Sequence, residues 1–228
     1  MFYLSGCSNI NTTKTVAYPT APGHVTSPDF KVRVNGQDIW TEKIGAGGHE
    51  RITRPGNYEK TDTQIFTYDH LEDLNVANFS CYGEQNITIT ASEDIKDYVI
   101  HPKSKHIVTQ VKGDVMTFRI DAPQHLYIEI NNLPHLAIFA NPLEENIPSP
   151  DATGVVYYGP GVHDIGEITL QSNQTIYIAG GAVVNANIRG VNLENVRIMG
   201  RGCLNGNLQI NTSKNIEVKD IFMRSTRG

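Results

Sequence analysis

The feature that most constrains the fold is a regular spacing near the C-terminal end of the chain. Two sets of apolar residues repeat every 20 residues, namely Ile176, Val196 and Ile216, and Ile178, Ile198 and Val218. A fixed period of about 20 to 50 residues is typical of repeat architectures. The two sets together give pairs of residues at positions i and i+2, such as Ile176 and Ile178. Each pair lies in a short run without helical periodicity, which indicates a strand. The sequence therefore predicts a β-solenoid with coils of about 20 residues.

The open end of such a solenoid is a second expectation. Gly228, the last residue, follows closely on the third of these strands. A solenoid buries its end against further coils or a cap. We therefore expect a truncated solenoid in which the strands over residues 216–223 present unpaired backbone groups and apolar side chains.

Composition limits the class of protein. A chain of 228 residues forms one or two domains, and its 20 glycines and 11 prolines favour strands and turns over helices. The net charge of −5 and the absence of a long Lys/Arg run argue against nucleic acid as a partner.

Alternation with a period of two predicts the fold of the preceding region. Residues 30–34 alternate between apolar and charged side chains, and Asn35-Gly36 supplies a hairpin turn. Further strands are predicted at 37–40, 64–68, 87–91, 98–101, 107–111, 115–120, 126–130 and 136–139. Many short strands with regular turn signals are typical of a β-sandwich. We place this sandwich at residues 25–140.

A proline-rich segment separates the two predicted domains. Residues 141–150 contain three prolines, which cannot continue a central strand. The prediction is therefore an all-β chain in which residues 141–154 form a linker and residues 155–228 form the truncated solenoid. Its first strands are expected at 155–158, 162–163 and 167–170.

The N-terminal residues resemble a targeting signal. Leu4-Ser5-Gly6-Cys7 resembles the lipobox of bacterial lipoproteins, although six residues before Cys7 are fewer than the roughly 15–30 of a working signal. The resemblance implies a lipid on Cys7 and a clipped leader and flexible tether over residues 1–24. It also implies an exported protein, either a lipoprotein of the outer membrane or cell surface or a periplasmic protein. No transmembrane segment is expected, so the lipid would be its one contact with a membrane.

Cysteine and histidine spacing gives no support for a disulfide framework or a metal site. Cys7, Cys81 and Cys203 are an odd and sparse set, which favours isolated thiols. No Cys-x-x-Cys or His-x-x-x-His grouping occurs. We therefore expect neither a metal nor another cofactor.

Several glycine-rich phrases carry a family resemblance. Residues 157–184 contain Gly-Pro-Gly-Val-His and Tyr-Ile-Ala-Gly-Gly-Ala-Val, and residues 200–206 read Gly-Arg-Gly-Cys-Leu-Asn-Gly. They resemble the first coils of right-handed parallel β-helix glycoside hydrolases of the polygalacturonase family (family 28) and the related dextranase family (family 49). Residues 139–144, Phe-Ala-Asn-Pro-Leu-Glu, resemble the end of the N-terminal β-sandwich of some bacterial members. The resemblance implies the N-terminal part of a bacterial enzyme that hydrolyses a polysaccharide.

The catalytic motifs of that family are missing. The resemblance would require Asn-Thr-Asp, Asp-Asp, Gly-His-Gly and Arg-x-Lys strings, and none occurs in this sequence. Hydrolysis of a glycosidic bond needs two carboxyl groups placed on either side of that bond. We therefore assign no catalytic residue, leave the substrate-binding residues open and expect these 228 residues alone to be inactive.

A few acidic residues and one histidine remain to be weighed as substitutes. Glu144 and Glu145 are interpreted as exposed linker residues, and Glu217 and Asp220 as a solvated face of the last coil. His163 follows the Gly-Pro-Gly turn and is interpreted as stabilising it.

Two other functions stay open. A non-catalytic carbohydrate-binding or adhesive module would be favoured by aromatic side chains exposed on one sandwich face. A polysaccharide lyase would require a cluster of carboxylates for Ca²⁺, which the sequence does not reveal.

Overall fold

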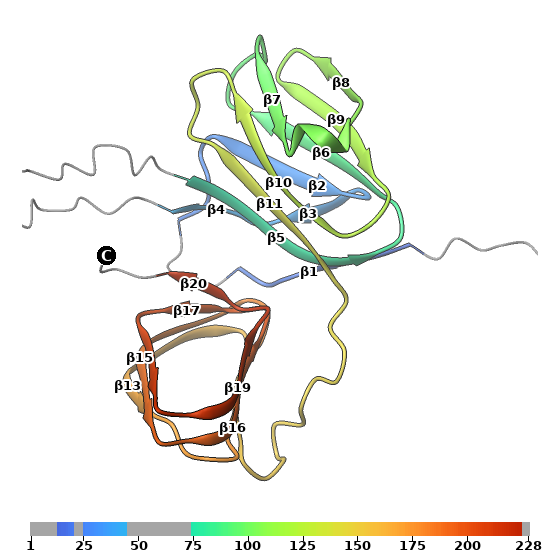
Figure 1. Ribbon diagram of the computed structural model, residues 1–228. Helices are drawn as coiled ribbons and strands as arrows, with labels where there is room; N and C mark the ends of the chain where they lie inside the picture. The colour runs from blue at the N-terminus through green and yellow to red at the C-terminus, as the bar shows by residue number, and fades with distance from the viewer. Residues whose placement is uncertain (1–12, 21–24, 45–73, 225–228) are drawn as a thin grey trace, which may run out of the picture.

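The computed structural model describes residues 13–20, 25–44 and 74–224, and these form two β domains joined by a linker (Figure 1). The one helical element among them is a 3₁₀ turn at Lys103–Lys105. The predicted all-β class is confirmed. The predicted strand at 64–68 lies outside the described residues.

The N-terminal domain consists of two sheets. One has the order β1 (Lys14–Ala17), β5 (Leu74–Tyr82), β11 (Leu136–Pro142), β10 (Gln124–Ile130) and β7 (Tyr98–His101), with β4 (Thr41–Ile44) paired to β5. The other has the order β3 (Gln37–Ile39), β2 (Phe30–Val34), β6 (Gln85–Ala91), β9 (Val115–Ile120) and β8 (Thr109–Lys112). We call them the six-stranded and the five-stranded sheet.

The two sheets face each other across one hydrophobic core, which is the arrangement of a β-sandwich. Alternate residues of β2 and β6 are buried, whereas β5 and β11 also bury residues in succession. Phe79 and Ile138 from one sheet and Ile89 and Met116 from the other have no exposed surface. The period-two alternation thus places the apolar side chains between the sheets and leaves the opposite face of each sheet for other contacts.

Three strands of the six-stranded sheet were not predicted from the sequence, namely β1, β4 and β5. Residues 14–17 were expected in a flexible tether, but they form β1 and pair antiparallel with β5. Strand β1 is held by backbone hydrogen bonds to β5 and has no large apolar side chain. Its amino-acid composition therefore gave no sign of a strand. Strand β5 was not predicted, because Asn75, Asn78 and Ser80 interrupt its apolar pattern.

The C-terminal domain is a parallel β-helix. One sheet has the order β12 (Val155–Tyr158), β14 (Thr175–Ile178), β16 (Glu194–Gly200) and β19 (Lys214–Lys219). The other has β13 (Gly161–Thr169), β15 (Ala182–Val191), β17 (Cys203–Asn205) and β20 (Phe222–Arg224), with β18 (Leu208–Asn211) also on β15. We number the coils 1 (β12–β13), 2 (β14–β15), 3 (β16–β18) and 4 (β19–β20).

The stacking of these coils corrects the predicted register in one place. Val196 stacks on Ile216 as the 20-residue period requires, but Ile176 stacks on Ile198, 22 residues further along. Coil 2 has two additional residues at its corner, where Ala182 N–H donates to the carbonyl of Ala179 at 2.9 Å. Because strand side chains alternate with a period of two, an offset of two leaves every apolar residue facing inward.

Asparagine and glycine make the tight corners of the coils. Asn173, Asn195 and Asn215 adopt left-handed φ values of 64°, 56° and 55°. Their amides form a ladder, with Asn195 donating to Asn173 and Asn215 donating to Asn195, each at 3.0 Å. At Gly200, a Cβ atom would lie 2.0 Å from the carbonyl oxygen of Ile178 on the coil below. Only glycine permits this approach of two coils.

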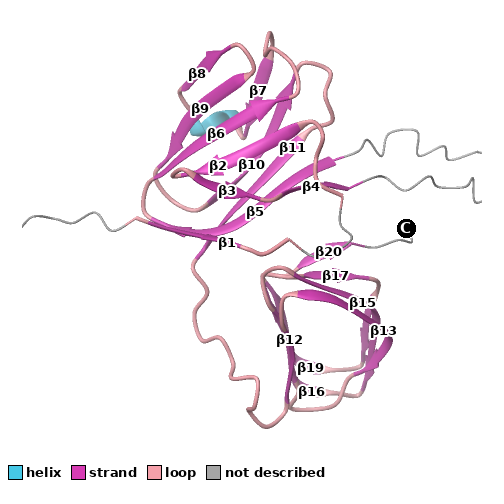
Figure 2. Cartoon of the chain, turned by 180° about the vertical axis from the view of Figure 1, so that it is seen from behind, coloured by secondary structure: helices cyan, strands magenta, loops and turns pink. Residues whose placement is uncertain are grey.

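The solenoid lies against the outer face of the six-stranded sheet, with β17 and β20 beneath β1 and β5 (Figures 1 and 2). Strand β11 ends at Pro142 and β12 begins at Val155, and the intervening loop runs down the side of the molecule (Figure 2). The surface between the two domains is therefore where residues distant in sequence meet.

Candidate functional site at the domain junction

The segment after β1 inserts between the two domains. A Cβ atom on Gly180 would lie 2.2 Å from the ring of Tyr18, and one on Gly181 would lie 2.7 Å from the carbonyl oxygen of Pro19. Because Gly180 and Gly181 have no side chains, the corner of coil 2 leaves room for Tyr18 and Pro19. The Tyr18 hydroxyl shares a hydrogen bond of 2.5 Å with the hydroxyl of Ser80 on β5.

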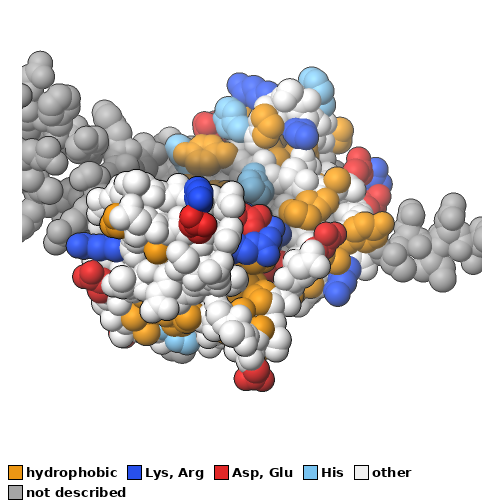
Figure 3. Space-filling model, turned by 60° about the horizontal axis from the view of Figure 1, so that its bottom comes forward, with side chains coloured by type: hydrophobic (Ala, Val, Ile, Leu, Met, Phe, Trp, Pro, Cys, Tyr) orange, Lys and Arg blue, Asp and Glu red, His pale blue; other side chains and the backbone are white. Residues whose placement is uncertain are grey.

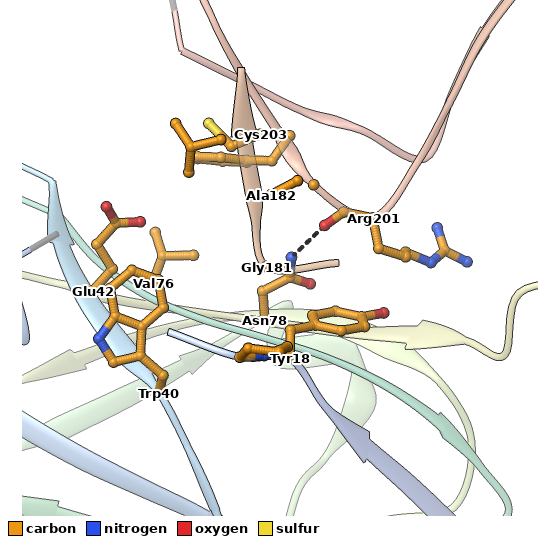
Figure 4. A pocket seen from close by; sticks show the side chains of 13 residues that line it. Tyr18, Trp40, Glu42, Val76, Asn78, Gly181, Ala182, Arg201 and Cys203 are labelled. Carbon is orange, nitrogen blue, oxygen red and sulfur yellow. Dashed lines mark hydrogen bonds between the residues drawn. The ribbon is translucent and has the colours of Figure 1, made fainter. Parts of the chain in front are cut away.

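Arg201, at the corner of coil 3, joins three parts of the molecule. Its side chain is 3 % exposed, and Nη2 donates to the carbonyl oxygen of Pro142 at 2.9 Å. Nη1 forms an ion pair with Asp220 of coil 4 at 3.0 Å. Its backbone carbonyl accepts a hydrogen bond of 3.4 Å from the amide of Asn78 on β5 (Figure 4). A buried guanidinium is stabilised by such charge-assisted contacts, so Arg201 joins β5 and β11 of the sheet to coils 3 and 4 of the solenoid.

The tyrosines at the junction are held in their neutral form. Burial raises the pKa of Tyr18 to about 12, against smaller lowering effects of Ser80 and Arg201. Burial also raises the pKa of Tyr177, and its hydrogen bond to Glu144 acts in the same direction. Tyr177 donates to Glu144 Oε1 at 2.9 Å and stacks on Tyr157 with ring centroids 4.9 Å apart. Neither hydroxyl is prepared for proton transfer at neutral pH.

A small cavity lies beside these residues. It has a volume of about 60 Å³ and is lined on one side by Trp40, Val76 and Asn78 and on the other by Val183, Cys203 and Phe222 (Figure 4). Sites for organic ligands measure about 300–1,000 Å³, so this cavity is too small for a sugar ring. The junction is a structural joint rather than a substrate pocket.

The residues that the sequence singled out lie apart from one another. His163 Nε2 donates to the carbonyl oxygen of Gly159 at 2.7 Å, which stabilises the Gly-Pro-Gly turn as expected. Glu144 binds Tyr177, and Glu145 is exposed in the linker. Asp220 was interpreted as a solvated residue, but it is the partner of the buried Arg201. Cys7 lies outside the described residues.

Each carboxylate on the four coils has a structural partner. Glu167, Glu194, Glu217 and Asp220 pair with Arg189, Lys214, Arg197 and Arg201, and Asp164 accepts from Asn185. Most partners are about one coil apart in sequence, so the pairs stabilise the stack. The hydrogen bond from Arg197 is the main cause that lowers the pKa of Glu217, which keeps this exposed carboxylate ionised. A general acid would need a raised pKa instead.

Other chemistry is not supported by the part of the chain that the structure describes. Its side chains bring no three His, Cys, Asp or Glu groups together as a metal site. Cys81 and Cys203 are buried, and burial raises the pKa of the Cys81 thiol to about 11. No helix over the described ranges is both long and apolar enough to span a membrane.

Sequence reasoning missed the three residues that organise the junction, Tyr18, Asn78 and Arg201. One signal was present, because Arg201 lies between two glycines at a corner where the coils approach closely. Because the coils approach closely at this corner, the side chain of a charged residue has to extend away from its own coil. For Tyr18 and Asn78, the sequence gives no comparable sign.

Over most of its length the chain is similar in fold to a solved structure, although comparison of sequences finds no match. No family model and no curated protein matches the sequence. Among seven matching solved chains is Dex49A from Penicillium minioluteum, with a TM-score of 0.63 at 17 % identity. The similarity covers 92 % of this chain and 60 % of Dex49A. It confirms a β-helix of the type found in the two families that the glycine-rich phrases resemble.

Proposed function

We propose that this chain is the N-terminal part of a glycoside hydrolase that acts on a polysaccharide, of the polygalacturonase or dextranase type. The observation that carries the proposal is the fold similarity to Dex49A, whose name is that of a family 49 dextranase, over 92 % of this chain. The glycine-rich phrases of coils 1 to 3 support it independently, since they resemble families 28 and 49.

In this proposal the described residues build the platform and do not perform the chemistry. Each carboxylate of the four coils is held in a ladder contact within the stack. The carboxylate pair for hydrolysis would therefore come from outside the described residues. The chain spans 60 % of the length of Dex49A, which leaves room for further coils in a protein of that type.

The test is an assay for new reducing ends on dextran and on polygalacturonate. We expect residues 1–228 to give no signal above the blank and the full-length product of the gene to hydrolyse one of the two polymers. Turnover by residues 1–228 would contradict the absence of a catalytic pair. An inactive full-length product on both polymers would contradict the proposed reaction.

A carbohydrate-binding module is the second candidate. Three exposed tyrosines favour it, with Tyr82, Tyr98 and Tyr127 exposed by 60 %, 42 % and 38 %. Sugar binding on a surface usually relies on flat, accessible rings, and in the stacked pair Tyr157 is half-buried and Tyr177 is only 2 % exposed. Affinity electrophoresis in gels containing dextran distinguishes this candidate, because a module would be retarded without hydrolysing the polymer.

We also propose that the protein is exported and carries a lipid on Cys7, either at the outer membrane or at the cell surface. The support is the lipobox-like run Leu4-Ser5-Gly6-Cys7. Metabolic labelling with an alkyne fatty acid tests it in a bacterial host that expresses the full gene. Label is expected on the wild-type protein and not on Cys7→Ser, and an unlabelled wild-type protein would refute the anchor.

A further inference from the structure

The outer face of the six-stranded sheet is covered over some strands and exposed over others. Val76 and Ser80 point outward from β5 and are 5 % and 2 % exposed, because the solenoid lies on them. On β10 the outward residues are His125, which is exposed, Tyr127, which is 38 % exposed, and Glu129, which is half-buried and contacts His101 of β7 at 2.8 Å. Figure 3 shows histidine and hydrophobic side chains gathered on the sandwich beyond the solenoid.

Successive coils contact successive strands of this sheet. Gly180 of coil 2 contacts Tyr18, which follows β1. In coil 3, the backbone carbonyl of Arg201 accepts a hydrogen bond from Asn78 of β5. Coil 4 reaches β11, where the ring centroids of Phe222 and Phe139 are 5.9 Å apart. The order of the strands in the sheet is β1, β5, β11, β10 and β7. The solenoid therefore advances by one strand with each coil.

This correspondence has a simple geometric cause. Neighbouring strands of a sheet are about 4.7–4.9 Å apart, and coils of a parallel β-helix are joined by the same hydrogen bonds. The two repeats therefore stay in register over any number of coils. A fifth coil would lie over β10 and a sixth over β7. His125 stands where the fifth coil would meet the sheet, since its ring is 5.0 Å from that of Phe139.

The end of the stack supports the same continuation. Inward residues of coil 3 such as Ile198 and Leu204 have no exposed surface. In coil 4 the equivalent positions are Val218 and Met223, which are 41 % and 43 % exposed. Strands β19 and β20 are the outermost strands of their sheets, so their outer backbone groups are open to pairing. One apolar coil would cover this end and β10 together.

We propose that β10 and β7 form the docking surface for two further coils of the same β-helix, supplied by a C-terminal continuation of this polypeptide. The partner is defined by its chemistry. It is a parallel coil with apolar residues facing inward and an outward apolar or aromatic residue at the position of Phe222. The proposal rests on the proposed function for the existence of further coils, and on the coil-to-strand register for where they lie.

The test compares the reaction of histidines with diethyl pyrocarbonate in residues 1–228 and in the full-length gene product, read by mass spectrometry. We expect the modification rate of His125 to fall about tenfold in the full-length product. His106 is the internal control, because it is exposed in the turn after the 3₁₀ helix and should react equally in both. Equal reactivity of His125 in both proteins would overturn the proposal.

A second variant removes the dependence on the natural continuation. Residues 1–224 are extended by two copies of residues 206–224, which continue the stack because Arg224 pairs with Asn205, and which repeat the Phe222 position twice. A folded extension, shown by slow amide hydrogen exchange in the added strands, should protect His125 in the same way, and a folded extension that leaves it reactive would overturn the proposal. A full-length product that protects His125 but hydrolyses no polymer would keep the docking surface and reject the proposed function.

Sugar is the competing occupant of this surface. Isomaltotriose and trigalacturonate are added to residues 1–228 while the signals of Tyr127 and His125 are followed by NMR. We expect no shift of these signals at millimolar sugar. Saturable shifts at both residues, together with an unprotected His125 in the full-length product, would assign the surface to a glycan and overturn the proposal.

Discussion

The substitution Gly180→Ala tests the domain junction by adding one methyl group. The three heavy atoms nearest to the new Cβ all belong to the Tyr18 ring, at 2.2, 2.5 and 2.7 Å. Real Cβ contacts are not that short, so the ring must move. It is held by its hydrogen bond to Ser80 and by the Gly180-Gly181 corner, and cannot swing aside freely. We expect Tyr18 to be displaced and the junction to loosen.

The size of the effect follows from the kind of contact. Overpacking a filled site by one carbon costs about 1–3 kcal/mol. For a chain of this length, 1 kcal/mol corresponds to about 2–4 °C in Tm, so we expect a loss of about 2–12 °C. Gly159→Ala is the matched control, because the nearest atom to its Cβ is 3.9 Å away. Its Tm should stay within about 1 °C of the wild type, as for other substitutions without a clash.

The double substitution Tyr18→Ala, Gly180→Ala separates the clash from other effects. Without the ring, the three atoms nearest to the Cβ of alanine at position 180 are gone, and the backbone there has an ordinary conformation. It should then stabilise the protein by about 0.4–1 kcal/mol, because alanine restricts the unfolded chain. Gly180→Ala is therefore expected to lower the free energy of unfolding of the wild-type protein and to raise that of the Tyr18→Ala protein.

Fluorescence of the single tryptophan is a suitable assay. Trp40 lines the cavity at the junction, so its emission reports the loosening of this region during thermal or urea unfolding. A Gly180→Ala protein as stable as the wild type, or equally destabilised with and without Tyr18, would refute the role assigned to this contact.

Three further outcomes follow from the solenoid and the junction. Ile198→Ala should cost about 2–5 kcal/mol by urea unfolding, because its side chain is fully buried, whereas Val218→Ala should cost less than about 1 kcal/mol, because it is 41 % exposed. The raised pKa of Tyr18, about 12, gives stability that is present below pH 10 and lost as pH rises toward 12, and Tyr18→Phe should reduce this loss in urea titrations over that range, with the remainder due to Tyr177. Arg201→Met should destabilise the junction by about 1.5–3 kcal/mol, because the carbonyl oxygen of Pro142 loses its charged donor. An unchanged urea midpoint would contradict this.

The sequence predicts the repeating parts of the fold well because their signals are local. Strands such as β2 and β6 alternate within five to seven residues, and the spacing of Val196 and Ile216 reflects a direct backbone pairing. The 22-residue step from Ile176 to Ile198 was hidden, since apolar residues at i and i+2 fit either offset equally well.

The junction could not be predicted in the same way. Tyr18 and Ser80 are 62 residues apart, and Asn78 and Arg201 are 123 residues apart. Such contacts depend on where two independently folded sheets meet, and neither partner departs from its local pattern. Strand β5 was missed for a related reason, because its outward polar residues are buried by the solenoid and not by its own sheet.

The most direct test of the coil-to-strand register is a double-mutant cycle on Phe139 and Phe222. The account predicts that Phe139→Ala and Phe222→Ala are coupled by about 1 kcal/mol in urea unfolding, as expected for two aromatic rings in contact. Phe139→Ala and Val183→Ala should be additive, because Val183 lies two coils away from Phe222. Additivity of the phenylalanine pair, or equal coupling of both pairs, would contradict the register in which each successive coil of the solenoid contacts the next strand of the six-stranded sheet.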